Sequence, residues 1–252
     1  MRTIKLILQY EGGNYAGWQT QDNAVTIQEL IEQTLATVIQ EQVRVAGASR
    51  TDSGVHALGQ VAAFKTSNSI PLQKLHRALN GILPPDIRVA EVAEVEEGFV
   101  PRYAKEKTYR YAIAHGEFLS PFQSRYVWHV RESLNFDAMQ AAAKSLVGEH
   151  DFTSFTASGG GEKNHVRTIL SITFGAGGFV NTCVGDENLY HFDIIANGFL
   201  YKMVRNIIGT LVEVGRAKIA PEQITRVLEA KNRTLAGPTA PAHGLCLVSV
   251  RY

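Results

Sequence analysis

The segment Gly47–Gly54 carries the clearest candidate for a catalytic carboxylate. It reads Gly-Ala-Ser-Arg-Thr-Asp-Ser-Gly, with Asp52 two residues after Arg50. A neighbouring guanidinium favours the ionised form of a carboxyl group, so Asp52 could act as a nucleophile or a base at neutral pH. Asp-Ser-Gly is also ordinary turn chemistry, and Arg50 could be a surface charge. The local sequence leaves both a turn and an active site open.

Basic and aromatic side chains are interleaved in a second candidate segment. Basic groups contact phosphates and aromatic faces stack on exposed bases, so this pattern is typical of nucleic-acid contact. A strand with one charged, solvated face and tyrosines in the core gives the same pattern. Tyr109 and Tyr111 share one face of such a strand, so at least one is expected to pack. The basic residues are Arg102, Lys105, Lys107 and Arg110.

A narrow polar stripe interrupts the apolar segment 199–214 at helical spacing. It could be the exposed edge of a helix or the lining of a substrate cleft, and the pattern favours neither. The stripe consists of Lys202, Arg205, Asn206, Gly209 and Glu213.

The glycine-rich segment Ser158–Lys163 invites a phosphate-loop interpretation. Its spacing does not match G-x-x-x-x-G-K-[ST], and Asn164 follows the lysine. A flexible loop is predicted instead, with basic groups at Lys163, His165 and Arg167. His56 is expected to be a packed histidine rather than a ligand.

Composition narrows the class of protein. A chain of 252 residues with 45% hydrophobic residues can fill one large core or two smaller ones. No apolar run is long enough to span a membrane, and the start lacks a signal-peptide stretch. The net charge of +1 means that a polyanionic partner requires local clustering of positive charge. A cytoplasmic protein is expected.

Cysteine and histidine spacing gives no metal-binding pattern. There is no CxxC, no HExxH and no regular Cys/His spacing, which argues against a structural zinc site. Cys183 and Cys246 are interpreted as isolated buried thiols, with a disulfide between them left open.

The candidate residues must be positioned by strands and helices, which the alternating and helical periodicity of the sequence predicts. A capping box, Thr26 with Glu29, opens the first helix. The other expected helices are 71–83, 136–147, 199–214 and 221–230. The expected strands are 3–10, 43–48, 55–64, 87–95, 108–114, 169–174, 190–196 and 245–250.

This order of elements predicts an α+β protein of two related domains, each a mainly antiparallel sheet covered by helices on one face. The first domain, residues 1–104, carries the Asp52 loop. The second comprises residues 105–252.

The chain resembles the tRNA pseudouridine synthase A family over essentially its whole length. The most specific motif is Arg50-Thr51-Asp52-Ser53-Gly54-Val55-His56, continuing to Gly59-Gln60-Val61. The other similar segments are Tyr10-Glu11-Gly12 through Gly17-Trp18-Gln19, Leu83-Pro84-Pro85-Asp86-Ile87-Arg88-Val89, Lys107-Thr108-Tyr109-Arg110-Tyr111, Gly148-Glu149-His150-Asp151-Phe152-Thr153-Ser154-Phe155 and Met203-Val204-Arg205-Asn206.

The resemblance implies a tRNA pseudouridine synthase that acts on uridines 38–40 of the anticodon stem-loop. Asp52 would be the catalytic aspartate, and Arg50 would assist extrusion of the base. Tyr109 would stack on the flipped uracil, Arg205 would pair with the aspartate, and Leu245 would form an apolar wall. Where the family usually has a Phe-His-Ala-Arg-like segment, this chain has Phe99-Val100-Pro101-Arg102, so that position receives no role.

The resemblance also implies a homodimer with tRNA lying across both subunits. It further implies that the second domain, residues 105–252, completes an active-site cleft between the domains and the RNA-binding surface. Isomerisation of uridine needs neither a metal nor an organic cofactor, and none is expected. The other tRNA contacts predicted are Lys163, Arg167 and Lys202, besides the four basic residues of segment 102–110. Two alternatives remain: a non-catalytic RNA-binding or RNA-folding module, and an Asp-nucleophile phosphatase. A phosphatase would need a DxD carboxylate where Gly54 stands.

Overall fold

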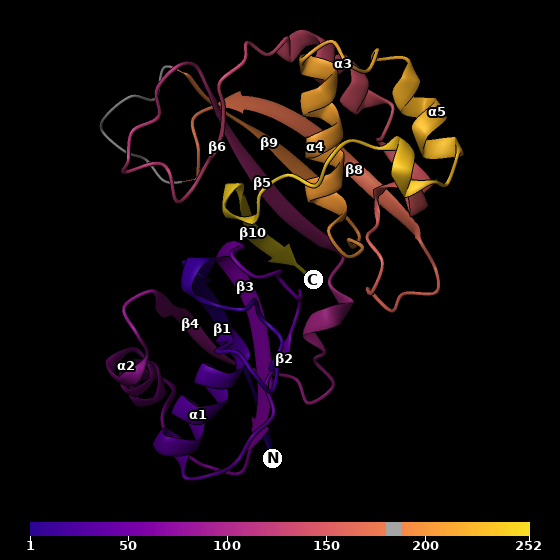
Figure 1. Cartoon of the computed structure of the whole chain (residues 1–252). Helices are drawn as coiled ribbons and strands as arrows, with labels where there is room; N and C mark the ends of the chain where they lie inside the picture. The colour runs from indigo at the N-terminus through magenta and orange to yellow at the C-terminus, as the bar shows by residue number, and fades with distance from the viewer. Residues whose placement is uncertain (180–187) are drawn as a thin grey trace. The chain divides into compact units, whose positions relative to one another are not determined.

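The chain divides into two compact units in its computed structural model, which describes residues 1–179 and 188–252 (Figure 1). The first unit comprises Met1–Lys105 and Leu247–Tyr252, and the second comprises Glu106–Cys246. The expected second domain ran through to residue 252. The last strand, β10 (Leu245–Arg251), lies beside β3 (His56–Thr66) of the first unit from Leu247 onwards, while its first two residues, Leu245 and Cys246, belong to the second unit. Cys246 is a buried thiol, and Cys183 lies outside the described residues.

The first unit is a sheet with two helices. Strand β1 lies between β4 and β3 and is antiparallel to both, β2 pairs with β3, and β10 follows β3 on its other side. Helices α1 and α2 contact each other and lie on the same side of these strands (Figure 1). The elements are β1 (Arg2–Tyr10), α1 (Ile27–Ile39), β2 (Ala46–Gly47), β3 (His56–Thr66), α2 (Leu72–Ile82), β4 (Ile87–Val95) and β10 (Leu245–Arg251).

The core of the first unit follows from the periodicity of its sequence. Alternate residues of β1, from Ile4 to Tyr10, are buried. In α1, Thr26 caps the helix by accepting a hydrogen bond from the backbone N–H of Glu29, as the capping-box pattern predicts. The buried face of α1 is formed by Ile27, Ile31, Leu35 and Ile39.

Strand β2 is much shorter than the expected strand 43–48. Side chains of α1 take the hydrogen bonds of the preceding backbone: Glu32 accepts from the N–H of Val45 at 2.9 Å, and the amide of Gln28 donates to the Val45 carbonyl at 3.0 Å. Backbone groups that side chains satisfy do not need a partner strand. The expectation of a full strand was wrong for this reason.

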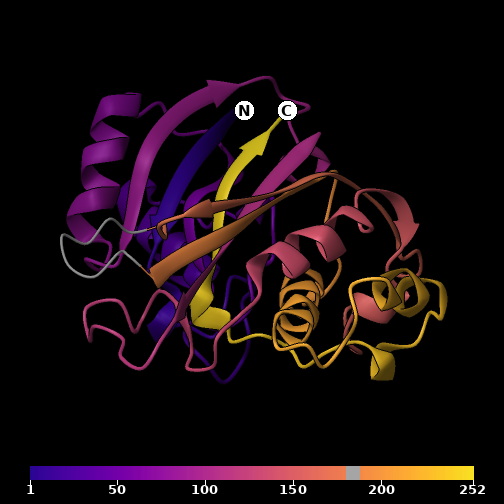
Figure 2. The same ribbon diagram turned by 90° about the horizontal axis from the view of Figure 1, so that it is seen from above.

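The second unit is built on an antiparallel sheet in the order β5, β9, β8, β7, with β6 parallel to β5. Helices α3 and α4 contact each other and pack against β8 and β5, on one side of the strands (Figure 2). The elements are β5 (Glu106–His115), β6 (Trp128–Val130), α3 (Phe136–Lys144), β7 (Gly148–Asp151), β8 (Val166–Ala176), β9 (Leu189–Ala196), α4 (Met203–Gly215) and α5 (Gln223–Glu229).

Helix α4 begins at Met203 instead of residue 199, because Lys202 has a left-handed backbone with φ of 58°. Its polar stripe is covered at two of its five positions, Asn206 and Gly209. Asn206 is fully buried, and a Cβ at Gly209 would lie 1.7 Å from the carbonyl oxygen of Pro238. At these two positions the stripe is therefore neither an exposed edge nor a cleft lining, but the contact surface for the segment 236–240.

The α+β class predicted from the sequence is confirmed. Two short strands, β6 and β7, were not predicted. They have three and four residues, and the Gly-Glu-His-Asp sequence of β7 lacks the alternation of a half-buried strand. Across residues 1–179 and 188–252, no helix combines the length and apolarity needed to cross a membrane.

Candidate active site

Asp52 lies in the loop between β2 and β3 of the first unit, and the backbone of that loop is anchored on both sides of it. The backbone N–H of Trp18 donates to the Thr51 carbonyl at 3.0 Å, and the N–H of Val55 donates to the Asp52 carbonyl at 3.1 Å. Ser53 Oγ donates to the Tyr15 carbonyl at 3.1 Å. Asp52 is half-buried and Arg50 is exposed. The loop thus presents a carboxylate from a fixed backbone.

Two glycines let the neighbouring segment approach this loop closely. A Cβ at Gly17, whose φ of 91° already favours glycine, would lie 2.6 Å from the Thr51 carbonyl oxygen. A Cβ at Gly12 would lie 2.0 Å from the Val55 carbonyl oxygen. Segment 12–18 therefore packs directly against the loop backbone.

His56 is a packed histidine, as predicted. It is 3% exposed, its Nδ1 accepts a hydrogen bond from the backbone N–H of Gly12 at 3.0 Å, and Glu11 Oε1 lies 3.6 Å from the same nitrogen. Because Nδ1 accepts, the neutral ring carries its proton on Nε2. His56 thereby ties the start of β3 to the segment that packs against the Asp52 loop.

Two buried side chains near the loop received no role from the sequence. Gln60 of β3 accepts from the Ser49 N–H at 3.2 Å and donates to the Ser49 carbonyl at 2.6 Å. The hydroxyl of Tyr10 lies 2.8 Å from Thr51 Oγ1 and accepts from Gln60 Nε2 at 3.4 Å. The available signal was a glutamine inside an otherwise apolar strand, within the most specific motif.

The candidate substrate-binding residues belong to the second unit. Tyr109 of β5 is 5% exposed and makes an edge-to-face contact with Phe199, with ring centroids 5.1 Å apart. Tyr111 is fully buried, and its hydroxyl donates to the Pro241 carbonyl at 2.7 Å. Burial raises the pKa of Tyr111 well above its usual value. The expectation that at least one tyrosine packs is confirmed. Leu245, 5% exposed, begins β10.

Arg205 lies on α4, and its guanidinium is oriented by a chain segment of the same unit. Arg205 Nε donates to the Ala240 carbonyl at 2.8 Å. The buried amide of Asn206 holds that segment, since its Oδ1 accepts from Thr239 Oγ1 at 2.7 Å and from Arg233 at 3.0 Å. The segment 236–240 thus fixes the Nε end of the Arg205 side chain within the second unit.

The basic residues of segment 102–110 differ in their surroundings. Arg102 and Lys105 are exposed, whereas Lys107 is 9% exposed. Arg110 forms a two-pronged ion pair with Asp193 on the paired strand, with both N–O distances at 2.7 Å. The hydrogen bond from Asp193 raises the pKa of Arg110. Arg110 thus has a protein carboxylate as its partner, while Arg102 and Lys105 are open to solvent.

The remaining predicted cationic contacts are spread over the second unit. Lys163 is exposed in the glycine-rich segment, which is a loop as predicted. Arg167 on β8 donates to the carbonyls of Asn164 and Val166, and burial lowers its pKa. Lys202 Nζ lies 5.0 Å from the ring centroid of Tyr201. Among these, Lys163 is the most accessible to a phosphate.

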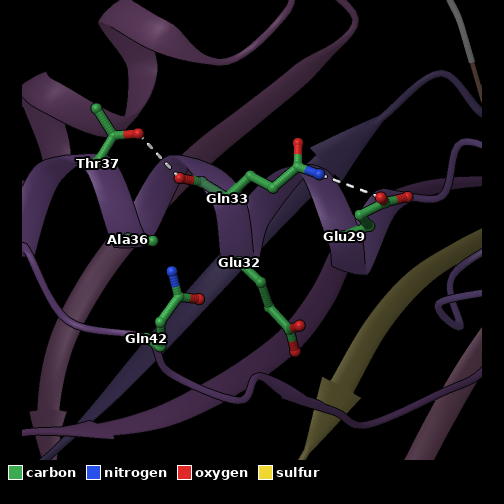
Figure 3. A pocket seen from close by; sticks show the side chains of 6 residues that line it. All are labelled: Glu29, Glu32, Gln33, Ala36, Thr37 and Gln42. Atoms are coloured by element: carbon green, nitrogen blue, oxygen red, sulfur yellow. Dashed lines mark hydrogen bonds between the residues drawn. The ribbon is translucent and has the colours of Figure 1, made fainter.

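A hollow on the surface of α1 is unsuited to nucleic acid (Figure 3). Two acidic residues, Glu29 and Glu32, are among its lining residues, and their negative charge disfavours a phosphate there. Within this hollow, the side-chain amide of Gln33 donates a hydrogen bond to the carboxylate of Glu29 at 3.1 Å. The other lining residues are Ala36, Thr37 and Gln42.

Within residues 1–179 and 188–252, no three His, Cys, Asp or Glu side chains are grouped so that they could hold a metal ion.

Comparisons with a family model and with curated proteins point to the same family. A family model described as tRNA pseudouridine synthase matches residues 6–104 and 142–252. The tRNA pseudouridine synthase A of Thermoanaerobacter sp. (strain X514) is 45% identical over 253 residues, which covers 100% of both chains. The protein of the same name from Geobacter sulfurreducens is 47% identical over the same length and coverage.

Among solved structures, the archaeal box H/ACA sRNP Nop10-Cbf5 complex contains a chain that is 10% identical. The match covers 94% of this chain and 60% of that chain, with a TM-score of 0.37. A similarity of that size carries no argument about the site.

Proposed function

Because the chain belongs to the tRNA pseudouridine synthase family, we propose that it isomerises uridines 38–40 of the tRNA anticodon stem-loop with Asp52 as its catalytic carboxylate. The enzymes of this family are isomerases that convert uridine to pseudouridine in tRNA. The reaction breaks the N-glycosidic bond, rotates the uracil, and forms a bond from ribose C1′ to uracil C5. The hydrogen on C5 leaves as a proton and N1, released from the ribose, takes up a proton, so the atoms balance without a co-substrate.

The observation that carries the proposal is the anchored loop around Asp52. A carboxylate held on fixed backbone next to an exposed arginine can act repeatedly at one atom of a bound nucleotide. Asp52 could attack ribose C1′, attack uracil C6, or remove a ribose proton to give a glycal. All three routes require an ionised carboxylate, and all three require that the base be extruded from its stack.

The neighbouring roles follow the family resemblance. Arg50, exposed on the same loop, would occupy the place of the extruded base. In the second unit, Tyr109 would stack on uracil and Leu245 would form an apolar wall. Arg205 belongs to the second unit and Asp52 to the first, so their pairing stays a prediction.

The proposed partner is the anticodon stem-loop of tRNA. Its backbone requires cations open to solvent, and Arg102, Lys105 and Lys163 meet that requirement. Lys107, Arg110, Arg167 and Lys202 are less accessible or already hold protein groups, so they would contribute less. A homodimer that works in the cytoplasm completes the proposal.

Release of tritium from tRNA labelled at uridine C5 tests the function directly, because each new C5–C1′ bond frees one labelled proton. Release is expected with the unaltered protein and not with Asp52→Asn. A tRNA transcript with cytidine at positions 38–40 should release no tritium. If release from that transcript equals release from the normal one, the assignment of the sites is wrong. Tight binding of tRNA without any release would indicate the alternative, a non-catalytic RNA-binding module.

A further inference from the structure

We propose that Tyr10, Thr51 and Gln60 are positioning residues that fix the backbone on both sides of Arg50 and so set the direction of Arg50 and Asp52. The inference rests on the proposed function, in which these two side chains act on the extruded nucleotide. None of the three needs to touch the RNA. They would act through the loop alone.

Gln60 fixes the residue before Arg50. Its side-chain amide pairs with both backbone groups of Ser49, accepting from the N–H at 3.2 Å and donating to the carbonyl at 2.6 Å. A side-chain amide that uses its oxygen and its nitrogen on one residue mimics a strand partner for that residue. Gln60 is fully buried, so water cannot take over the hydrogen bonds of its side-chain amide.

Tyr10 fixes the residue after Arg50. Its hydroxyl lies 2.8 Å from Thr51 Oγ1, and the two residues are 4% and 6% exposed. Gln60 Nε2 also donates to the Tyr10 oxygen, at 3.4 Å. One connected set of hydrogen bonds therefore runs from Ser49 through Gln60 and Tyr10 to Thr51.

Arg50 is the single residue between the two attachment points. Its side chain is exposed, while Ser49 and Thr51 on either side are held from the interior of the first unit. The carbonyl of Thr51 is itself bound by Trp18, immediately before Asp52. Loss of one internal bond should therefore rotate the loop backbone and displace both reactive side chains, without removing any group that contacts RNA.

The test compares Tyr10→Phe, Thr51→Val and the double variant with the unaltered protein. The single-turnover rate of pseudouridine formation is measured at saturating tRNA and at a temperature where circular dichroism shows every variant folded. Each single variant should lower this rate by about tenfold or more, since small displacements of catalytic groups cost that much. Affinity for tRNA should change by less than about threefold, because no RNA contact is lost. The double variant should be no slower than the slower single variant, because the same hydrogen bond is already absent.

Two control variants separate positioning from a general loss of stability. Thr66→Val removes a buried threonine hydroxyl at the last residue of β3, the strand that also contains Gln60. This hydroxyl donates a hydrogen bond to Glu41. It should lower the melting temperature and leave the rate unchanged. Thr51→Ser retains the hydroxyl and should retain the rate. The proposal is overturned if Thr51→Val or Tyr10→Phe matches Thr66→Val in rate, or if Thr51→Ser is as slow as Thr51→Val. If the unaltered protein forms no pseudouridine, the proposed function fails instead.

Discussion

At the scale of single residues, a substitution of Asp52 distinguishes three roles for this residue: catalyst, structural turn residue and RNA-recognition residue. Asp52→Asn keeps the size of the side chain and removes its charge, and the loop backbone is held by groups other than the carboxylate. We therefore expect a melting temperature within a few degrees of the unaltered protein and tRNA affinity within about tenfold, roughly 1.4 kcal/mol. Pseudouridine should be undetectable by nucleoside chromatography of treated tRNA.

Each other outcome for Asp52→Asn identifies a different role. A large fall in melting temperature would make Asp52 a structural turn residue. Lost affinity for tRNA would make it a recognition residue. Turnover that persists after contaminating unaltered enzyme is excluded would remove Asp52 as the catalyst.

Tyr109 tests whether an aromatic ring or a hydroxyl serves the substrate. If the ring stacks on uracil, Tyr109→Ala should lose about 1–3 kcal/mol of transition-state stabilisation and Tyr109→Phe much less. The measurement is kcat/KM below the melting temperature of each variant, since the ring also contacts Phe199 and its loss leaves a cavity. Equal losses in the two variants would assign the role to the hydroxyl. Unaltered rates in both would make Tyr109 a core residue only.

At the scale of elements, two helical glycines with opposite surroundings predict opposite effects. Gly209 of α4 has the Pro238 carbonyl where a Cβ would be, so Gly209→Ala should destabilise the protein by about 1–3 kcal/mol. Gly81 of α2 has no atom within 4 Å of the same position. Gly81→Ala should stabilise by about 0.4–1 kcal/mol, because alanine restricts the unfolded chain. Urea denaturation of both variants measures the contrast, and a neutral Gly209→Ala would show that segment 236–240 moves aside freely.

The ion pair between Asp151 and Lys231 predicts a pH dependence for the end of β7. The hydrogen bond from Lys231, together with those from Thr153, lowers the pKa of Asp151 from 3.8 to about 2. A lowered pKa in the folded state gives a stabilisation that is complete above pH 3.8 and disappears as the pH falls towards 2. Lys231 is largely exposed, so the effect should stay within about 1 kcal/mol.

Asp151→Asn should accordingly lower the melting temperature at pH 6 and lose that difference only as the pH falls from 3.8 towards 2. Thermal unfolding of both proteins across this range is the measurement. A difference that stays constant with pH would mean that the hydrogen bonds to Thr153 matter and the charge does not.

At the scale of the whole molecule, a net charge of +1 makes tRNA binding depend on a few accessible cations. Affinity should fall as salt rises, and each lost phosphate contact should reduce the slope of log affinity against log salt by about 0.7–0.9. Lys105→Ala and Lys163→Ala should each show this reduction, because both side chains are exposed. Lys74→Ala on α2 is the matched control, since Lys74 is exposed but outside the predicted contacts. Identical slopes for all three variants would exclude Lys105 and Lys163 as RNA contacts.

Local patterns in the sequence determined much of the architecture by themselves. The alternation of Ile4, Leu6 and Leu8 and the capping box at Thr26 specify β1 and the start of α1, because side-chain period and caps act within a few residues. The motif around Asp52 identified the family, since its residue types are specific even without coordinates.

Tertiary contacts decided what the local sequence left open. Strand β2 is short because α1 satisfies the Val45 backbone, and the polar stripe of α4 is covered at Gly209 because segment 236–240 packs against it there. The bonds from Gln60 to Ser49 and from Tyr10 to Thr51 join residues 11 and 41 positions apart. Hydrogen bonds between such distant residues leave no periodic trace in the sequence, and only the folded chain shows which polar groups satisfy one another.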